Sequence, residues 1–429
     1  MVLFNHVLQG NTFALDQASV SVHNKGQDIA ERIDLPMRAF AEGYYENLIR
    51  MYEHLGVQFR PQRFVYNFGV ASEEESGHCD SRASYFVHSS NNHRIPPIRP
   101  REVSPAVYFA RIAYVAFFYL WWTICCYVFP PYPASRTNDC ESLGDYVQRI
   151  MLPQQFVDLY LLPLISSVAT CSHKELLGCP AIDVTDYKKK SAGKKHYTVA
   201  GVHAVQARLG EGLDSKISST VTRVEEFNGG RVSVTWIDDN GSSQTGVFDR
   251  VIMAVAPDVV GKVYAPLQKA MSKIPSTTVT SFVTGDGIAI SKAVFQEQIS
   301  EARRAPKAQT IHFRTSVDLG RTESHHVHPT GAIVTTCPLQ QVDLQDVLRY
   351  AQFRRALRTP ESRRVVNTLF KEGGSQDLLD EKSSVWRNGD GNVWLVGGWC
   401  WDGMVLLEGC IVSAMRVAHD LDVDVPWSK

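Results

Sequence analysis

The sequence lacks a strong charge bias and a pattern of paired cysteines. Its 429 residues include 44 Lys and Arg against 45 Asp and Glu, which leaves a formal net charge of −1. Proteins that bind bulk nucleic acid carry a clear excess of positive charge, so we expect no nucleic-acid partner. The nine cysteines are an odd number and form no Cys-x-x-Cys pair. This scatter is typical of reduced thiols in a cytoplasmic protein and not of a secreted disulfide framework.

The common hydrolase motifs are absent as well. No Gly-x-Ser-x-Gly, His-Glu-x-x-His or phosphate-binding P-loop motif occurs, so the corresponding hydrolase, zinc-protease and nucleotide-triphosphatase classes have no support. The N-terminus has no basic start followed by an apolar core, so we predict no secretory signal peptide. A hydrophobic content of 44% with 10% aromatics predicts a folded chain, and its length predicts two or three domains or one interleaved pair.

One uncharged run, IAYVAFFYLWWTICCYVF at 112–129, is long enough to raise the question of a membrane. As a helix it rises about 27 Å, close to the hydrocarbon thickness of about 30 Å. Its many aromatic residues favour interfaces and pockets over lipid tails. Our leading interpretation is a buried helix, within 107–130, that lines an apolar cavity. Two alternatives remain: peripheral contact with a membrane through 112–129, and a helix that spans the membrane. The substrate-pocket residues predicted on this basis are Tyr119, Trp121 and Trp122.

Local patterns predict several elements. Apolar residues recur at helical spacing from Tyr44 to Leu55, and Gly56 follows as a C-terminal capping glycine. Asp239-Asn240-Gly241 predicts a hairpin turn between two alternating runs. The lysines at 188–190 and 194–195 lie near Ser191 and Gly193, which indicates an exposed loop.

Three histidines, His325, His326 and His328, precede Pro329. A zinc site needs a further ligand at a suitable spacing, and none is evident. We therefore predict a polar loop or a substrate-side lid there, and no metal site.

The pattern of the C-terminal segment VWLVGGWCWDGMVLLEG predicts a buried strand, two glycines, a loop and the start of a helix. The N-terminus of such a helix is a favourable place for an anion. It resembles the flavin-contact motif of the flavin amine oxidase and phytoene-desaturase-like superfamily, although an ordinary strand-to-helix crossover stays open. In that family the first amides of the last helix approach the flavin, whereas Trp399 stands where the family usually has an acidic residue. Cys400 beside this motif is interpreted as a packed or exposed thiol rather than a covalent flavin link. The resemblance implies flavin contacts at Gly397, Gly398, Asp402, Gly403, Met404 and Val405.

Two earlier stretches resemble the same superfamily. The helix-like run 200–213 followed by STVTRVEEF is similar to its adenine-side strand, where Val221 matches the valine that contacts adenine. DRVIMAVAPDVV is similar to a second strand, with Ala254, Ala256 and Pro257 in place. These matches imply FAD as cofactor and Val221, Ala254 and Pro257 as cofactor-binding residues. More narrowly, segments such as YLLPLISSVATCSHKELLGCPAIDVTDY resemble uncharacterised fungal FAD/NAD(P)-binding-domain proteins, from about Leu15 onwards.

The family's opening strand, Gly-x-Gly-x-x-Gly loop and helix, which hold the FAD pyrophosphate, have no match in the 429 residues. Gln9 stands where an acidic residue would bind the adenosine ribose. Three interpretations stay open: a truncated gene model, a flavin-free descendant, and a chain that binds flavin weakly without the loop.

The resemblance implies an α/β fold with a Rossmann-like FAD-binding domain, incomplete at its N-terminus, and an interleaved α+β substrate domain. We assign 1–70, 196–270 and 386–429 to the FAD-binding domain and 71–195 and 271–385 to the substrate domain. The implied activity is an FAD-dependent, amine-oxidase-like oxidation of a small apolar or lipid-like substrate by hydride transfer to flavin. The alternatives are a flavin-free isomerase, cyclase or binding protein, and a membrane-peripheral non-catalytic protein.

Overall fold

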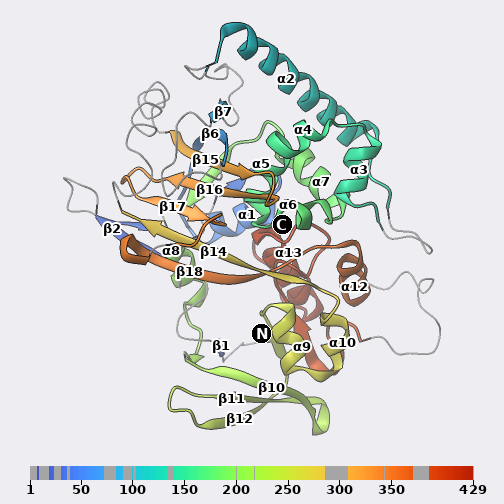
Figure 1. The fold of residues 1–429 in the computed structure, drawn as a ribbon. Coiled ribbons are helices and arrows are strands. Elements are labelled where there is room, and N and C mark those ends of the chain that lie inside the picture. Colours follow the sequence, from blue (N-terminus) through green and yellow to red (C-terminus); the bar gives the residue numbers. More distant parts are fainter. Residues whose placement is uncertain are drawn as a thin grey trace.

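The structure is a computed structural model of the chain. It describes 7–8, 19–23, 30–35, 39–71, 84–89, 99, 103–133, 140–199, 201–216, 218–285, 308–342, 344–370 and 386–428. Figure 1 shows a large sheet beside a layer of helices, and a smaller body of helices and strands below them. This mixed α/β architecture is the predicted fold class.

The large sheet has seven strands in the order β18-β14-β17-β16-β15-β6-β7. Its neighbours pair antiparallel except β15 and β6, which run parallel. Along β14 the buried residues Val279, Ser281 and Val283 alternate with more exposed ones, the period-two pattern of a strand with one covered face. The strands are β6 Arg63–Val70, β7 Ser84–Ser89, β14 Ser276–Thr284, β15 Ala308–Ser316, β16 Arg321–Val327, β17 Ile333–Thr336 and β18 Val347–Ala356.

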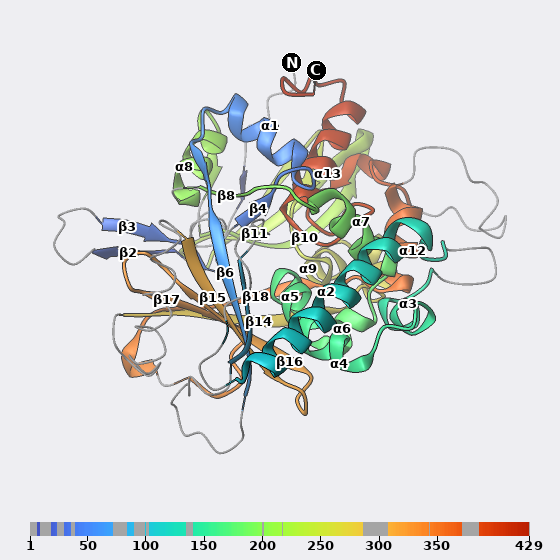
Figure 2. The ribbon, with the colours of Figure 1, turned by 90° about the horizontal axis from the view of Figure 1, so that it is seen from above.

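Helices cover one side of this sheet (Figure 2). The predicted N-terminal helix is confirmed as α1, Glu46–His54: its inward residues are buried, and Gly56 follows with φ of +65°. It shares one hydrophobic core with the other helices of this layer. These are α2 Pro105–Val128, α3 Leu143–Arg149, α4 Gln154–Phe156, the π-helical turn Val157–Leu161, α5 Leu162–Ala169, α6 His173–Leu177 and α7 Ala181–Ser191.

The smaller body contains parallel pairs made from distant parts of the chain. Strand β13, Val251–Met253, pairs parallel with β19, Val393–Leu395, and β1, Val7–Leu8, pairs parallel with β9, Ser215–Lys216. The predicted C-terminal strand, loop and helix are confirmed by β19 and α13, Leu407–Asp420. Nearby helices are α8 Val202–Gly210, α9 Pro257–Val263, α10 Gln268–Met271 and α12 Pro360–Phe370.

Three small antiparallel sheets complete the described residues. The Asp239-Asn240-Gly241 hairpin is confirmed: it joins two strands, and the Asp238 carboxylate accepts hydrogen bonds from the backbone N–H groups of Asn240 and Ser242. The sheets are β10 Thr220–Phe227 with β11 Arg231–Ile237 and β12 Ser243–Phe248, β2 Val20–His23 with β3 Ala30–Ile33, and β4 Ala39–Ala41 with β8 His196–Val199 and β5 Phe59–Pro61.

Two predictions about local structure need correction. The predicted lysine loop is confirmed for Lys194 and Lys195, which are exposed between α7 and β8, but it is wrong for Lys188, Lys189 and Lys190. These three belong to the last turn of α7, a position where cations suit the helix dipole. The aromatic run is helical as α2, but it lies on the surface, and only 17% of its most apolar window is buried. Because α2 is apolar all round, its sequence could not indicate which side would be covered.

The N-terminus of α1 is capped by a side chain from the other end of the chain. The buried Glu408 carboxylate accepts hydrogen bonds from the backbone N–H groups of Asn47 at 2.9 Å and Leu48 at 3.0 Å, and from the Asn47 amide at 2.8 Å. Burial raises the pKa of Glu408, and these donors act against that rise. Since α1 has no side-chain cap of its own, Glu408 takes over that role.

We expect Glu408→Ala to lower the free energy of unfolding by about 2–3 kcal/mol, because buried N–H groups lose a charged acceptor. Urea unfolding would measure this. Glu408→Gln, which keeps one acceptor, should cost less, and Glu46→Ala, which removes an exposed ion pair with Arg50, should cost under about 0.5 kcal/mol. Equal stability of Glu408→Ala and the unchanged protein would contradict the capping role.

Candidate functional site

A large cavity, with a volume of about 830 Å³, lies between the parallel pair β13–β19 and the seven-stranded sheet. Its size is in the range of pockets for small molecules and cofactors. A second, small cavity of about 30 Å³ lies behind it and shares Arg355, Ala356 and Val405 in its lining.

The ends of two parallel strands form one wall of the large cavity. Both β13 and β19 end at this edge, and the residues that follow them, 254–257 and 397–399, line the cavity. Most of these side chains are small or absent, so the backbone can approach a bound group closely. Gly397 has a φ of +150°, which disfavours a side chain. Ser413 on α13 fixes this turn, because its hydroxyl accepts a hydrogen bond from the Gly397 N–H at 3.0 Å.

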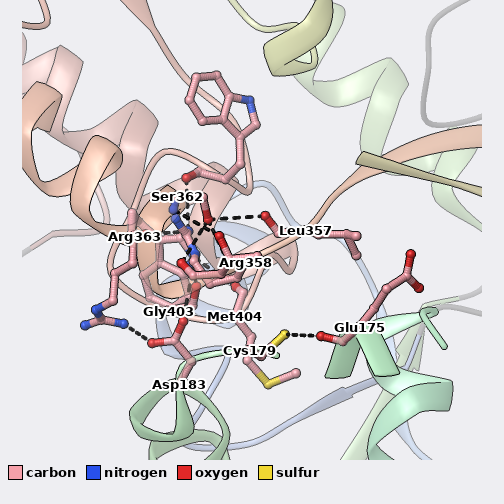
Figure 3. A network of polar contacts seen from close by, with 12 residues as sticks. Glu175, Cys179, Asp183, Leu357, Arg358, Ser362, Arg363, Gly403 and Met404 are labelled. Carbon is pink, nitrogen blue, oxygen red and sulfur yellow. Dashed lines mark hydrogen bonds and ion pairs between the residues drawn. The ribbon is translucent and has the colours of Figure 1, made fainter. Parts of the chain in front are cut away.

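The loop from Gly398 to Leu406 is held from behind by a buried arginine (Figure 3). Arg358, 4% exposed, donates to the backbone carbonyls of Trp399 at 3.0 Å, Trp401 at 2.7 Å and Gly403 at 3.3 Å. Buried Asp183 faces this guanidinium at 3.8 Å and also pairs with Arg363. Burial raises the pKa of Asp183, against the pull of the two arginines. Together these charges fix the backbone that forms the cavity wall.

A large side chain packs inside the same loop. The Trp401 indole N–H donates to the carbonyl of Met404 at 2.9 Å, and its ring lies against Gly403 and Gly409. A Cβ atom at Gly409 would come within 2.3 Å of that ring, so glycine is required there. The loop is therefore a packed structure, not an open turn.

The opposite wall belongs to the seven-stranded sheet and is mostly apolar. Phe64, Ile311 and Phe313 line it and are buried in one cluster. His326 is the buried imidazole on this wall, and its Nε2 lies 2.8 Å from the Gln309 side-chain oxygen. That oxygen is an acceptor, so Nε2 carries the proton. Burial lowers the pKa of His326 to about 3, so this imidazole is neutral near neutral pH. Its Nδ1 is buried and has no hydrogen-bond partner within the described part of the chain.

The histidine cluster differs from its prediction. His325 and His326 lie on β16 and are buried in the sheet, not in a loop or lid, because each finds a polar partner across the strands. His325 pairs with Glu323 and contacts the Thr335 hydroxyl at 2.9 Å, and His328 contacts the Thr330 hydroxyl at 2.9 Å. A search of the described residues finds no group of three ligands for a metal ion.

The structure brings part of the predicted cofactor set together. Ala254, Pro257, Gly397, Gly398 and Val405 all line the large cavity. The others lie outside its lining. Val221 is on β10 and packs against the core of the smaller body, and Asp402 is exposed. Gly403 and Met404 are buried beside Trp401, and Met404 also lines the small cavity. Cys400 is a fully buried thiol that does not line the large cavity either.

None of the three predicted substrate-pocket residues lines the large cavity, and the interpretation of their helix as a cavity wall is wrong. Tyr119 points outward, with 41% of its surface exposed and Lys188 at its hydroxyl. The Trp121 indole N–H donates to the carbonyl of Ile150 at 2.8 Å, and Trp122 is 1% exposed in the helical core. The sheet, not α2, supplies the apolar wall.

Sequence reasoning missed Asp183, Arg358 and His326. Asp183 and Arg358 lie in runs that resemble ordinary helix and strand ends, and their roles depend on contacts made far along the chain. The sequence analysis singles out His326 but predicts a loop, because β16, RTESHHV, has no alternating apolar pattern that would indicate a strand.

The geometry defines the class of fold: a mixed sheet body joined to a smaller body with parallel strands, with a cavity at the strand ends. Solved structures with this arrangement include cyclohexylamine oxidase from Brevibacterium oxydans IH-35A, with a TM-score of 0.54 and 10% identity, over 97% of this chain and 93% of that chain. A putrescine oxidase redesigned in its cofactor binding has a TM-score of 0.49 and 11% identity, over 94% of this chain and 90% of that chain. The likeness to cyclohexylamine oxidase shows that this chain has the same overall fold as that protein. Models of protein families give no match, and neither do curated protein sequences.

Proposed function

We propose that this chain is an FAD-dependent oxidoreductase that oxidises a small apolar substrate in the large cavity. The observation that carries the proposal is the wall formed by Ala254, Ala256, Gly397 and Gly398 at the ends of two parallel strands. Ligands of open α/β sheets bind at this edge. The similarity in fold to cyclohexylamine oxidase supports an oxidoreductase. We also propose that the chain is related more closely to the fungal FAD/NAD(P)-binding-domain proteins that its sequence resembles.

The residues present fit the ring end of a flavin better than its pyrophosphate end. At the ring end, small residues leave backbone exposed, and Arg355 places a cation on the cavity wall while its Nη2 donates to the carbonyl of Val405 at 2.6 Å. At the other end, these 429 residues contain no Gly-x-Gly-x-x-Gly loop. Each charge-assisted hydrogen bond from such a loop is worth about 1.5–3 kcal/mol, so we propose that these residues by themselves bind FAD weakly and reversibly.

When bound, flavin supplies an acceptor for a hydride equivalent. The protein's part is to orient the substrate and to exclude water. Phe64, Ile311 and Phe313 form an apolar wall, and His326 lies in this wall as a neutral imidazole whose Nε2 is held by Gln309. Pockets lined mainly by apolar and aromatic side chains favour apolar ligands. We therefore propose a small apolar molecule as the substrate class.

Titration of the purified protein with FAD, followed by visible absorption and flavin fluorescence, tests the proposal. We expect saturable binding that Ala254→Trp weakens at least tenfold, since the indole would occupy the cavity. Ala207→Trp on the exposed side of α8 is the matched control and should bind like the unchanged protein. A folded protein that binds no added FAD would overturn the proposal.

The alternative is a flavin-free isomerase, cyclase or binding protein that uses the same cavity. The absence of the glycine loop from the sequence favours it. It predicts a folded protein that does not bind FAD but is stabilised by small apolar molecules. Ala254→Trp, which fills the cavity, should remove that stabilisation, and Leu319→Ala, at an exposed turn residue, should leave it unchanged.

A further inference from the structure

The outer side of α2 is an exposed apolar surface that nothing in the proposed reaction uses. The largest contributors are Phe109, 67% exposed, Phe117, 63%, Leu120, 58%, and Val128, 61%. All residues of α2 are described, and each exposed one is uncharged. Exposed apolar patches of this kind mark interaction sites. We call the set of Val107, Phe109, Phe117, Tyr119, Leu120, Ile124, Tyr127 and Val128 the α2 face.

The inner side of α2 is fixed to the protein along its length. Trp122, Cys125 and Cys126 are buried in the helical core, and near the other end Arg111 donates to the carbonyl of Tyr85 at 2.8 Å. Figure 1 shows α2 lying along the edge of the helical layer. A helix held in this way can lie flat on a membrane, but it cannot cross one without leaving its core. The geometry therefore favours surface contact over a span.

Positive charge lies beside the α2 face. Lys188 on α7 has its Nζ 2.5 Å from the Tyr119 hydroxyl and 4.1 Å from the ring centre, and the Tyr127 hydroxyl reaches the carbonyl of Lys189 at 3.5 Å. Lys190, Lys194 and Lys195 follow and are exposed. Asp186, the acidic residue of the same turn, pairs with Lys189 at 2.8 Å. The group thus has an excess of cations where tyrosines meet solvent.

We propose that the α2 face binds the surface of an anionic lipid bilayer, with the lysines of 188–195 at the headgroups. Apolar side chains would enter the interface, tyrosines would lie at headgroup level, and lysines would meet lipid phosphates and carboxylates, as in interfacial helices. The cytoplasmic leaflet has this negative charge, which agrees with a cytoplasmic protein. The inward residue Val115 belongs to the same apolar cluster as Phe64 and Phe313 of the large cavity. If the proposed function holds, the bilayer also stores the apolar substrate.

Flotation of the purified full chain with vesicles tests this, and it needs neither flavin nor substrate. We expect the protein to float with vesicles of phosphatidylcholine and phosphatidylserine and to float poorly with phosphatidylcholine alone. Phe117→Glu with Leu120→Glu should lower the partition coefficient at least tenfold. Lys188→Gln with Lys190→Gln should lower it about five-fold for each lysine. Phe227→Glu with Val247→Glu, on the β10–β12 sheet far from α2, is the matched control and should float normally.

Circular dichroism of each variant establishes that it is folded, which these exposed positions should permit. A folded protein that stays at the bottom of the gradient with anionic vesicles would overturn the proposal. Equal flotation of the Phe117→Glu, Leu120→Glu variant would overturn it too. Sedimentation that reveals a dimer abolished by that variant, without vesicle binding, would assign the α2 face to a second copy of the chain instead. FAD titration is independent of all three results, so failure of the proposed function is recognised separately.

Discussion

Replacement of Arg358 by alanine is expected to lower the free energy of unfolding by about 3–5 kcal/mol, the cost of breaking a buried ion pair by removing one partner. The variant would leave buried Asp183 with Arg363 as its remaining partner and leave the carbonyls of Trp399 and Trp401 without this donor. Since these carbonyls belong to the loop at the cavity wall, FAD affinity should fall with stability. Urea unfolding and FAD titration measure the two effects.

Two further variants separate charge from local packing. Arg354→Ala, on β18 four residues before Arg358 and partly exposed beside Asp258, should cost under about 1 kcal/mol. Arg358→Met combined with Asp183→Asn should be more stable than Arg358→Ala, because it leaves no buried carboxylate that has lost one of its two arginine partners. If the free energy of unfolding of Arg358→Ala lay within about 1 kcal/mol of that of the unchanged protein, the Arg358 guanidinium would not be what fixes the loop.

Mild acid is expected to destabilise the fold strongly between about pH 6.5 and pH 4. Burial lowers the pKa of His173 to about 4 and those of His312 and His326 to about 3, from an ordinary value of 6.5. Below pH 6.5 the unfolded chain takes up protons that the folded protein does not. Stability is therefore present above pH 6.5 and is lost as the pH falls. At pH 5 each histidine contributes a loss of about 2 kcal/mol, or roughly 6 kcal/mol together.

Other groups modify this profile near its acid end. Burial would raise the pKa of Glu323, but His325 and Arg314 outweigh it and bring the pKa to about 2, so further stability is lost below pH 4.5. Asp183 and Glu408, whose pKa values are raised, act in the opposite sense in the carboxyl range. Urea unfolding at pH 7.5 and pH 5 measures the net change. His173→Gln should reduce the loss of stability between the two pH values by about a third. Equal stability at pH 7.5 and pH 5 would contradict the presence of neutral buried histidines in the folded protein.

The elements near the site were predictable where their own sequence dictates them. The strand, paired glycines and helix at 393–420 follow from local periodicity and turn chemistry, as does the hairpin at Gly241. Residues that act across the chain were not predictable. Asp183 contacts Arg363, which lies 180 residues further along the chain. Glu408 caps α1 through Leu48, from which it is separated by 360 residues. The orientation of α2 was equally hidden, because a helix without a polar side gives no indication of which face meets the core.

The capping of α1 by Glu408 also sets an order of events during synthesis. The first helix leaves the ribosome long before the residue that satisfies its N-terminus, and β13 likewise waits for β19. Contacts of such long sequence separation form slowly, and incomplete chains expose apolar surface in the meantime. A nascent chain that stopped before Val393 would lack both contacts. The helical layer and the cavity wall can therefore reach their final form only once synthesis has passed Glu408.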